Sequence, residues 1–389
     1  DTPMEECGEI GALYQSRLTT YQIDRSRLDE FLLKRAAEAG CEVWRPAMVK
    51  EIGLTEGGVQ RLVVEKDGAR QSVEARWLVD ASGKAAVLAR KLGHWRRLES
   101  HPTNSMWARF SGVADLDSAE FAARHPEFAN RVRTARDTAN NILAGGGWWW
   151  WIIPLRRGNV GLGTFCGRRY FQPAAGDTIA DRLLKHVRAH PVGRELFAQA
   201  QVVGTDMKAY AHLPYRTDQM CGDGWVCVGD AAGFMDPLYS QGLDYCSHTV
   251  QAATALLERS LGGEAVAEQV AALNVQFLES YQRWFQALYQ EKYAYIGDAE
   301  LMRAAFLMDL ASYFIGPVRL VYDEPETEWV RLPYHGRAGA LFSGFMRFYN
   351  HRLARLGDRR WRAGCYGRRN RQVRLLIQSG FVPDIRAMF

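Results

Sequence analysis

The sequence lacks the patterns that mark several common classes of protein. Its seven cysteines are odd in number and include no Cys-x-x-Cys pair. This argues against a disulfide framework and favours reduced thiols in a cytoplasmic protein. No cluster of histidine and cysteine has metal-ligand spacing, so we predict no metal site. No internal repeat or low-complexity segment is present, which excludes repeat architectures.

Long apolar runs and a strong net charge are also absent. The most apolar long window, residues 304–322, is interrupted by Asp309, Pro317 and Arg319. It therefore predicts a buried or docking helix and no membrane span. The net charge of +5 is mild for 389 residues, and no recognised nucleic-acid motif accompanies it. The 47% hydrophobic and 24% charged contents are ordinary for a globular protein of two or three domains.

Phosphate-binding glycine motifs are missing as well. Gly161-Leu-Gly163-Thr-Phe-Cys-Gly167 has three residues between its last two glycines, where the dinucleotide fingerprint has two, and it lies inside a hairpin pattern. Even so, residues 77–92 and 224–261 both follow the order strand, glycine turn, helix that is typical of a nucleotide-binding sheet. We therefore predict an α/β domain that is interrupted by a β-rich one and followed by a helical region.

Tryptophan, by contrast, is concentrated in one place. Residues 147–163 read GWWWWIIPLRRGNVGLG and hold four of the twelve tryptophans. As a strand, this run places Trp149 and Trp151 on one face and Trp148 and Trp150 on the other. Four adjacent rings cannot all enter one core. An aromatic face on a core and a flat wall beside a ligand both stay open.

The most specific pattern is residues 224–242, GWVCVGDAAGFMDPLYSQG. An apolar strand ends at Gly229-Asp230, where a carboxylate can hold a hydroxyl group of a sugar or polyol. Asp236-Pro237 then make a rigid bend. Ser240-Gln-Gly242 begin a helix whose free N–H groups suit an anion or an electron-rich ring edge. The alternative is an ordinary strand–loop–helix connection with Ser240 as the helix cap.

These residues resemble the second flavin-binding motif of FAD-dependent monooxygenases with the p-hydroxybenzoate hydroxylase fold, and more narrowly that of flavin-dependent halogenases. Residues 21–29 (YQIDRSRLD) are similar to the family's helix start, and residues 79–83 (VDASG) to its sheet strand. Trp149-x-Trp151-x-Ile153-Pro154 resembles the halogenase tryptophan motif. The resemblance covers about residues 20–262. It implies an α/β, two-domain monooxygenase fold with a doubly wound FAD-binding sheet.

The implied domain boundaries follow from this resemblance. The FAD-binding domain takes residues 1–96 and 223–263, a β-rich substrate domain takes residues 97–222, and a helical region with a basic tail takes residues 264–389. Because the chain opens with Asp-Thr-Pro-Met and not with an initiator methionine, we expect it to begin part-way into a longer protein. The family's Gly-x-Gly-x-x-Gly turn and catalytic lysine would then lie upstream of Asp1.

The resemblance also implies roles for individual residues. Asp230 would hold the ribityl chain of FAD, and a separate flavin reductase would reduce the cofactor. The residues expected to contact FAD are Arg25, Gly229, Asp230, Pro237, Gln241, Gly242 and Leu243. A halide ion would bind at Gln241 and Gly242, and Ser240 is the candidate catalytic residue. Trp149, Trp151 and Tyr239 would face the substrate, with the two tryptophans keeping it off the flavin.

The activity implied is that of an oxidoreductase that uses a flavin hydroperoxide to halogenate an electron-rich aromatic compound, as in antibiotic biosynthesis. Tryptophan halogenases carry a glutamate just before the serine, where this chain has Tyr239. A neutral tyrosine cannot replace that carboxylate, which favours a phenol or pyrrole substrate over free tryptophan. Two alternatives stay open: an aromatic hydroxylase that uses the same hydroperoxide, and a flavin-free remnant that binds a partner.

A basic segment near the C-terminus needs a separate interpretation. Residues 347–374 contain ten arginines, interleaved with Tyr349, Trp361 and Tyr366. A solvated helical face, with arginine stems lying over aromatic rings, is one interpretation. The other is a docking surface for an acidic carrier protein that presents the substrate. We predict no nucleic-acid partner.

Overall fold

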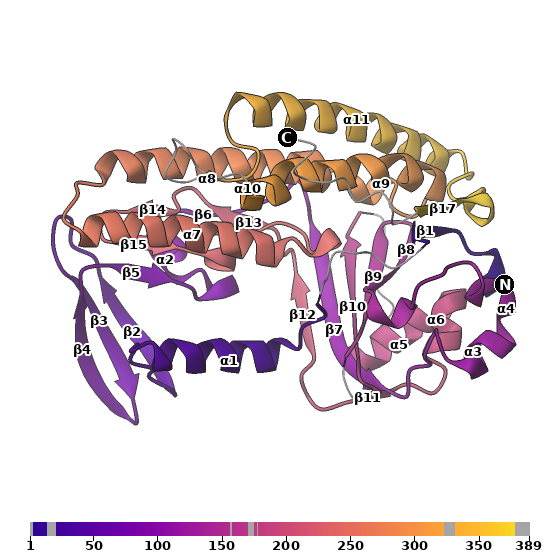
Figure 1. Ribbon diagram of the computed structural model, residues 1–389, viewed down its shortest axis with the longest axis horizontal. Coiled ribbons are helices and arrows are strands. Elements are labelled where there is room, and N and C mark those ends of the chain that lie inside the picture. Colours follow the sequence, from indigo (N-terminus) through magenta and orange to yellow (C-terminus); the bar gives the residue numbers. More distant parts are fainter. Residues whose placement is uncertain are drawn as a thin grey trace.

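The structure is a computed structural model that describes residues 3–13, 21–155, 158–169, 175–176, 178–322 and 331–377. It has the predicted mixed α/β architecture, with two groups of sheets lying side by side and long helices crossing over both (Figure 1). The predicted domain boundaries at residues 96, 222 and 263 stay predictions.

One group of sheets is built from two segments that are far apart in the sequence. The strands of the two predicted strand–turn–helix patterns lie side by side: β5 (Leu78–Asp80) pairs in parallel with β15 (Trp225–Cys227), and β14 (Cys221–Gly222) adds an antiparallel strand. Three further strands form an antiparallel sheet, β2 (Ala47–Gly53), β3 (Gln60–Lys66) and β4 (Ala69–Ala75). Residues 42–44 form no strand, because Pro46 has no N–H to extend the ladder and β2 begins after it.

The first helix, α1 (Arg25–Glu38), begins where predicted. Asp24 caps it, because its Oδ1 accepts a hydrogen bond from the backbone N–H of Ser26 at 3.2 Å. Its apolar stripe, however, is not covered by the described part of the chain. Phe31 and Leu32 are 58% and 54% exposed, and no residue of α1 is buried.

Asp80, at the end of β5, has a structural role. Its two carboxylate oxygens accept hydrogen bonds from the backbone N–H groups of Ser82 at 2.8 Å and Leu88 at 2.7 Å. These bonds fix the turn that leads through η2 (Gly83–Ala85) into the short helix α2 (Val87–Lys91). The carboxylate is buried, and each of its two oxygens already accepts a hydrogen bond from the backbone.

The second group centres on a six-stranded antiparallel sheet in the order β11-β7-β10-β9-β8, with β12 also paired to β7. Its strands are β7 (Thr103–Ser111), β8 (Asn141–Gly145), β9 (Trp148–Pro154), β10 (Val160–Gly167), β11 (Gln201–Val202) and β12 (Lys208–Ala211). Short helices flank it in Figure 1: α3 (Ala119–Arg124), α4 (Pro126–Ala129), α5 (Ile179–Ala189) and α6 (Pro191–Leu196). The helical stretch between residues 119 and 138 is divided, since Pro126 begins α4 directly after α3, and η3 (Arg136–Thr138) follows.

The tryptophan run lies in β9, and its alternation divides the four rings between two cores. Trp148 and Trp150 stack at 4.3 Å between ring centroids and pack on the core shared with α5 and α6. Trp149 and Trp151, 5.5 Å apart, face the core shared with the long helices. The predicted division of faces is confirmed, and it removes the difficulty of placing four rings in one core.

Two glycines make room for these rings. A Cβ atom on Gly163 would lie 1.9 Å from the indole of Trp151, and one on Gly145 would lie 2.2 Å from the indole of Trp148. Gly163 is opposite Trp151 in the β9–β10 register. Gly163 therefore serves the packing of an aromatic hairpin. This agrees with the prediction that the glycines of residues 161–167 are not a dinucleotide-binding fingerprint.

The remaining elements are mostly helical and follow β6 (Trp95–Arg97), β13 (Tyr215–Thr217) and β16 (Gly233–Phe234), which form a small sheet. They are α7 (Gly242–Leu261), α8 (Ala267–Leu288), η7 (Lys292–Ala294), α9 (Ala299–Tyr313), the π-helix η8 (Phe314–Val318), α10 (Arg319–Tyr322) and α11 (Gly336–Arg362). Figure 1 shows α8 and α11 side by side across the top of both sheet groups. At the ends of the described chain, β1 (Glu9–Ala12), after η1 (Met4–Glu6), pairs in parallel with β17 (Arg374–Ile377), after η9 (Asn370–Gln372).

The helical stretch Ala299–Val321 is long and apolar enough to cross a membrane, judged by length and composition alone. Its apolar window is 28% buried within the protein, and it contains the buried Asp309. The prediction of a docking helix and no membrane span stays a prediction.

His190 gives the tryptophan core a dependence on pH. Its ring lies edge-on to Trp148 and Trp150, and burial lowers its pKa to about 4. Because the unfolded side chain takes up its proton near pH 6.5, stability is lost as the pH falls from about 6.5 towards 4.

We expect the wild type to lose up to about 2 kcal/mol of unfolding free energy from the His190 side chain between pH 6.5 and 5. His190→Phe keeps the ring and should lose correspondingly less in urea unfolding at the two pH values, whereas His351→Gln, an exposed control, should behave as the wild type does. An unchanged pH dependence in His190→Phe would contradict this.

Candidate active site

The predicted FAD loop begins at a position that requires glycine. Gly229 follows β15 with a φ of +55°, and a Cβ atom there would lie 3.1 Å from the Cys246 sulfur of α7. Its backbone N–H donates to the Thr249 hydroxyl at 2.8 Å. The strand end is thereby held against α7, and η5 (Gly229–Ala231) turns the chain so that the next side chain points outward.

Asp230 occupies that outward position. Its carboxyl reaches solvent, although the surrounding protein is dense enough that burial raises its pKa, while the charge of Arg25 acts in the opposite direction. The Tyr215 hydroxyl fixes the backbone by donating to the Asp230 carbonyl oxygen at 2.7 Å. The structure thus brings the two predicted cofactor residues Asp230 and Arg25 near each other, with Arg25 itself paired to Asp29 at 3.1 Å.

The loop then forms a turn with an unusual backbone. Tyr239 and Ser240, in η6 (Leu238–Ser240), have φ values of +71° and +59°, and neither is glycine. Each such residue costs on the order of 1–3 kcal/mol and persists only where its surroundings hold it. The Ser240 N–H donates to the Pro237 carbonyl oxygen at 2.9 Å, and the Ser240 side chain is exposed. The candidate catalytic serine is therefore presented outward by a strained turn.

Side chains of α8 and of the segment after it hold this turn from behind. Tyr281 donates to the Phe234 carbonyl oxygen at 2.7 Å, and Tyr289 donates to that of Leu238 at 3.1 Å. The Trp284 indole N–H donates to the Gln241 Oε1 at 2.9 Å. Burial raises the pKa of both tyrosines well above the ordinary value, so they remain neutral donors. The shape of the loop is thus set by residues of the helical region.

Tyr239 is held by a buried ion pair. Its hydroxyl donates to Asp309 Oδ2 at 2.7 Å, and the Lys292 ammonium lies 2.6 Å from the same oxygen. The Lys292 and Asp309 side chains are 0% and 2% exposed. Burial lowers the pKa of Lys292, and the charge of Asp309 opposes that shift. Because the Tyr239 hydroxyl is engaged here, a substrate contact by Tyr239 would involve its ring.

The start of α7 is open to a ligand. The N-cap residue Gln241 makes no side-chain capping bond, and the N–H groups around Gly242 and Leu243 have no side-chain cap within the described residues. Gln241 is 5% exposed, and its amide Nε2 has no acceptor in the described part of the chain. Uncapped N–H groups, an unpaired buried amide and the nearby Asp230 fit the polar edge of a flavin and a halide ion. The roles of Pro237, Gln241, Gly242, Leu243 and Ser240 stay predictions.

A hydrogen-bonded chain joins the tryptophan motif to the FAD loop. The Trp149 indole N–H donates to the Tyr293 hydroxyl at 2.9 Å, and Tyr293 donates to Asp236 Oδ2 at 2.9 Å. Asp236 Oδ1 accepts the Leu238 N–H at 3.0 Å. Two motifs that are far apart in the sequence therefore meet through one buried tyrosine of η7. Trp149 is 2% exposed, and Trp151 is half-buried beside it. The predicted tryptophan wall is therefore part of a core, and through Trp149 it also borders the FAD loop.

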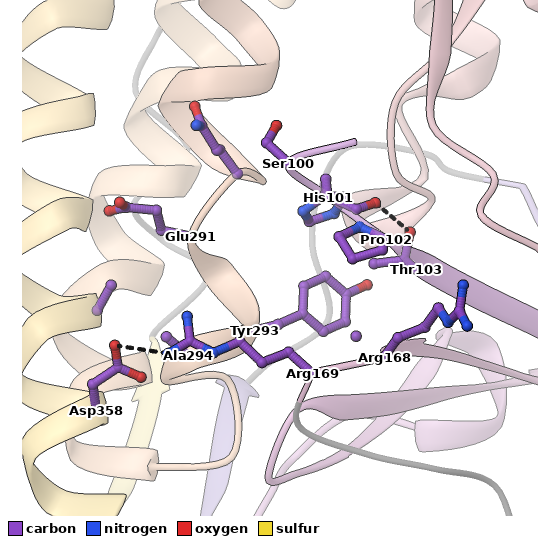
Figure 2. Close-up of a pocket in the computed structure, with 13 residues that line it drawn as sticks. Ser100, His101, Pro102, Thr103, Arg168, Arg169, Glu291, Tyr293, Ala294 and Asp358 are labelled. Atoms are coloured by element: carbon purple, nitrogen blue, oxygen red, sulfur yellow. Dashed lines mark hydrogen bonds and ion pairs between the residues drawn. The ribbon is translucent and has the colours of Figure 1, made fainter. Parts of the chain in front are cut away.

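A cavity of about 410 Å³ lies against this chain, between the ends of β7 and β10 and the segment that joins α8 to α9. Figure 2 shows the Tyr293 ring between His101 and Arg169 in this cavity. His101 is 3% exposed, and its Nε2 lies 3.1 Å from Asp236 Oδ2. Arg168, Arg169, Glu291 and Asp358 supply charge, with Arg169 and Asp358 3.9 Å apart.

Four of these residues were not predicted from the sequence: His101, Lys292, Tyr293 and Asp309. None of them lies in a recognisable motif. The one local signal was Asp309, a carboxylate that interrupts an apolar window and therefore needs a buried partner. Which residue supplies that partner is decided by the packing of η7 on α9.

Three aspartates also lie together within the described residues: Asp115, Asp117 and Asp137. All three are exposed, and the Asp137 N–H already donates to Asp117 Oδ2 at 2.7 Å. They are exposed and do not line the cavity, so we assign them no part in the candidate site.

Comparison with known proteins identifies relatives of this chain. The family model described as tryptophan halogenase matches residues 10–293. The chain is 28% identical over 255 residues to the brominase of 1H-pyrrole-2-carbonyl peptidyl-carrier protein from Pseudoalteromonas luteoviolacea (strain 2ta16), covering 63% of this chain and 57% of that protein. It is 28% identical over 312 residues to tetracycline 7-halogenase from Kitasatospora aureofaciens, covering 76% and 53%. The chain thus spans about half the length of the curated relatives it matches.

Solved structures share the fold. The flavin-dependent brominase Bmp2 matches with a TM-score of 0.63 and 23% identity, covering 88% of this chain and 81% of that one. Halogenase PltM in complex with phloroglucinol and FAD matches with a TM-score of 0.65 and 18% identity, covering 93% and 72%. The predicted two-domain α/β flavoprotein fold is confirmed.

The buried pair behind Tyr239 makes a prediction about stability. Lys292→Met leaves the Asp309 carboxylate buried without its cation, which should lower the unfolding free energy by about 3–5 kcal/mol. The double variant Lys292→Met with Asp309→Leu removes both charges and should retain more stability than the single variant. Urea unfolding of the three proteins checks both expectations. If Lys292→Met were as stable as the wild type, Lys292 and Asp309 would not form a charged pair in solution.

Proposed function

This chain belongs to the tryptophan halogenase family, and we propose that it halogenates an electron-rich aromatic compound, a phenol or a pyrrole, in an FAD-dependent reaction. The observation that carries the proposal is the chain Trp149–Tyr293–Asp236, which joins the tryptophan motif to the FAD loop. Relatives named as halogenases of pyrrolyl carrier proteins support a pyrrole. The PltM structure with phloroglucinol and FAD supports a phenol.

The residues of this chain would bind, orient and separate the reactants. Reduced FAD, delivered by a separate flavin reductase, would supply with O2 the oxidising equivalent that turns halide into an electrophile. Asp230 and Arg25 would hold the cofactor's polyol chain, and the uncapped start of α7 at Gly242 would face the flavin edge and the halide. Trp149, fixed by Tyr293, would keep the aromatic substrate away from the flavin.

We also propose a cytoplasmic location. All seven cysteines are free thiols in the structure. Burial raises the pKa of Cys166 to about 11 and that of Cys221 to about 12, so these thiols stay protonated and unreactive. A reducing compartment suits such a chain.

The product identifies the reaction. With a flavin reductase, saturating FAD, O2 and bromide, we expect resorcinol to gain bromine, because its hydroxyl groups activate the ring. In competition, resorcinol and a carrier-bound pyrrole should be brominated in preference to free tryptophan, because the position before Ser240 carries no carboxylate. Mass spectrometry of the products, with a bromide-free reaction as the control, tests both expectations. A hydroxylated product that does not depend on bromide would identify an aromatic hydroxylase. Absence of FAD binding in a direct titration would favour the flavin-free, partner-binding role.

The exposed face of α11 supports an acidic carrier protein as partner. Its first half shows an apolar stripe, in which Leu341, Phe345 and Phe348 are 77%, 52% and 59% exposed. Its second half continues the same helical face with four exposed arginines: Arg352, Arg355, Arg359 and Arg362. An apolar stripe beside like charges suits a partner with an apolar contact and an acidic rim. We propose that this face receives the carrier.

Arg360 does not belong to that surface. Its guanidinium forms bonds of 2.7 and 2.9 Å to both carboxylate oxygens of Asp298 and also pairs with Glu300. Arg369 and Arg371 pair with Glu300 and Glu6. The basic segment is therefore partly structural, as the solvated-face interpretation allows, and its docking function is confined to the exposed face of α11.

Charge reversal tests the carrier proposal. Arg355→Glu, Arg359→Glu and Arg362→Glu together should weaken binding of a pyrrolyl-loaded acidic carrier protein at least about tenfold. The matched control reverses three exposed charges elsewhere: Arg27, Lys185 and Lys208. Raising the salt from about 50 to 300 mM should weaken binding to the wild type and to the control, because the screening length shortens. Equal affinity of both triple variants at low salt would leave α11 without a docking role.

A further inference from the structure

His101 lines the cavity beside Tyr293, and only one of its two ring nitrogens has a hydrogen-bond partner among the described residues. The Nε2 of His101 lies 3.1 Å from Asp236 Oδ2, and Tyr293 and the Leu238 N–H also donate to that carboxylate. The Asp236 side chain is 0% exposed. An ionised carboxylate only accepts hydrogen bonds, so the proton of a neutral His101 is placed on Nε2. Its Nδ1 is then an acceptor.

The orientation of the His101 ring is fixed, and Nδ1 remains available. Phe285 and Tyr293 contact the ring edge-on, each with centroids 5.2 Å away. Within the described residues, Nδ1 has no hydrogen-bond partner. It is also not completely enclosed by protein atoms. His101 lines the cavity together with Pro102 and the ring of Tyr293. Behind its charged mouth, the cavity therefore combines flat apolar surfaces with an acceptor whose orientation the protein fixes, an arrangement typical of small-molecule sites.

The glutamate that precedes the serine in tryptophan halogenases, and could accept a substrate hydrogen bond there, is absent from this chain. The residue before Ser240 is Tyr239; burial raises its pKa well above the ordinary value, so it stays neutral, and its O–H is directed to Asp309. Lys292 and Asp309 are buried behind it as an ion pair through Asp309 Oδ2. His101 instead reaches the same loop through Asp236, one residue before Pro237.

We propose that the cavity binds the aromatic substrate and that His101 Nδ1 accepts the hydrogen bond of its phenol O–H or pyrrole N–H. The proposal rests on the proposed function for the class of substrate, and it adds the site and the recognising atom. An acceptor on that O–H or N–H draws the proton away from the ring heteroatom, which raises electron density at the ring carbons that an electrophile attacks. Asp236 is a positioning residue, because it fixes which nitrogen of His101 carries the proton.

The cavity is charged at its mouth and aromatic at its deeper end. Arg168, Arg169, Glu291 and Asp358 surround it and remain in contact with water, while His101 and Tyr293 lie deeper (Figure 2). A ring without a donor gains only the apolar contacts. The geometry therefore predicts selection for O–H or N–H groups over their methylated equivalents.

A binding experiment without FAD or halide tests this directly. The dissociation constants of resorcinol and of 1,3-dimethoxybenzene, which has no O–H, are measured by ligand-observed NMR on the full chain. His101→Phe keeps a ring but removes the acceptor, and should weaken resorcinol binding about 2- to 13-fold, the factor that one neutral hydrogen bond contributes. Binding of 1,3-dimethoxybenzene should not change. His186→Phe, a buried histidine in α5, is the matched control.

A second variant keeps the test decisive if His101→Phe does not fold. Ser100 is exposed at the cavity mouth, and Ser100→Trp should block resorcinol binding without disturbing a core. Failure of the wild type to bind resorcinol, or equal affinity of the wild type and Ser100→Trp, would overturn the proposal. Unchanged resorcinol affinity in a folded His101→Phe would do the same. Resorcinol binding through His101 without any halogenation would instead overturn only the proposed function.

Discussion

The geometry of the candidate site depends on hydrogen bonds that reach the loop from the helical region. Tyr239 and Ser240 adopt backbone angles that a free peptide would leave, and α8 with η7 supplies the groups that hold them. Most of these groups are tyrosine hydroxyls that burial keeps neutral. Their direction is fixed because each ring is packed in the same core. The helical region is therefore part of the site, even though it carries none of the motif residues.

The same core transmits position between the two groups of sheets. Tyr293 accepts from Trp149 on one side and donates to Asp236 on the other, and His101 joins at the same carboxylate. A shift of β9 by a fraction of an ångström would lengthen bonds on both sides of Tyr293. Leaving these buried polar groups unpaired would cost free energy. The tryptophans of β9 and the predicted FAD loop are therefore held in one relative position. This is the property needed where a reactive small species must pass from one reactant to another.

Local patterns were sufficient to predict some of this arrangement. The alternation of side chains placed the four tryptophans on two faces, and the apolar runs before Gly83 and Gly229 predicted the two strands that the structure pairs as β5 and β15. The partners of those elements were not predictable, because no local rule tells which tyrosine of α8 meets which carbonyl group. Tyr239 shows the limit most clearly. Its place before Ser240 suggested the substrate, but a lysine and an aspartate from later elements determine where its hydroxyl points.

The pairing of tryptophan with glycine in the β8–β9–β10 hairpins limits how this family member can change. Each indole lies where the Cβ atom of a neighbouring residue would otherwise be, so Gly163 and Gly145 can acquire a side chain only after Trp151 or Trp148 has been lost. Loss of a ring first would leave a void that any small residue could then fill. The order of substitutions is thus directional: the tryptophan must go before the glycine. A lineage that keeps both of these rings therefore keeps a glycine opposite each of them.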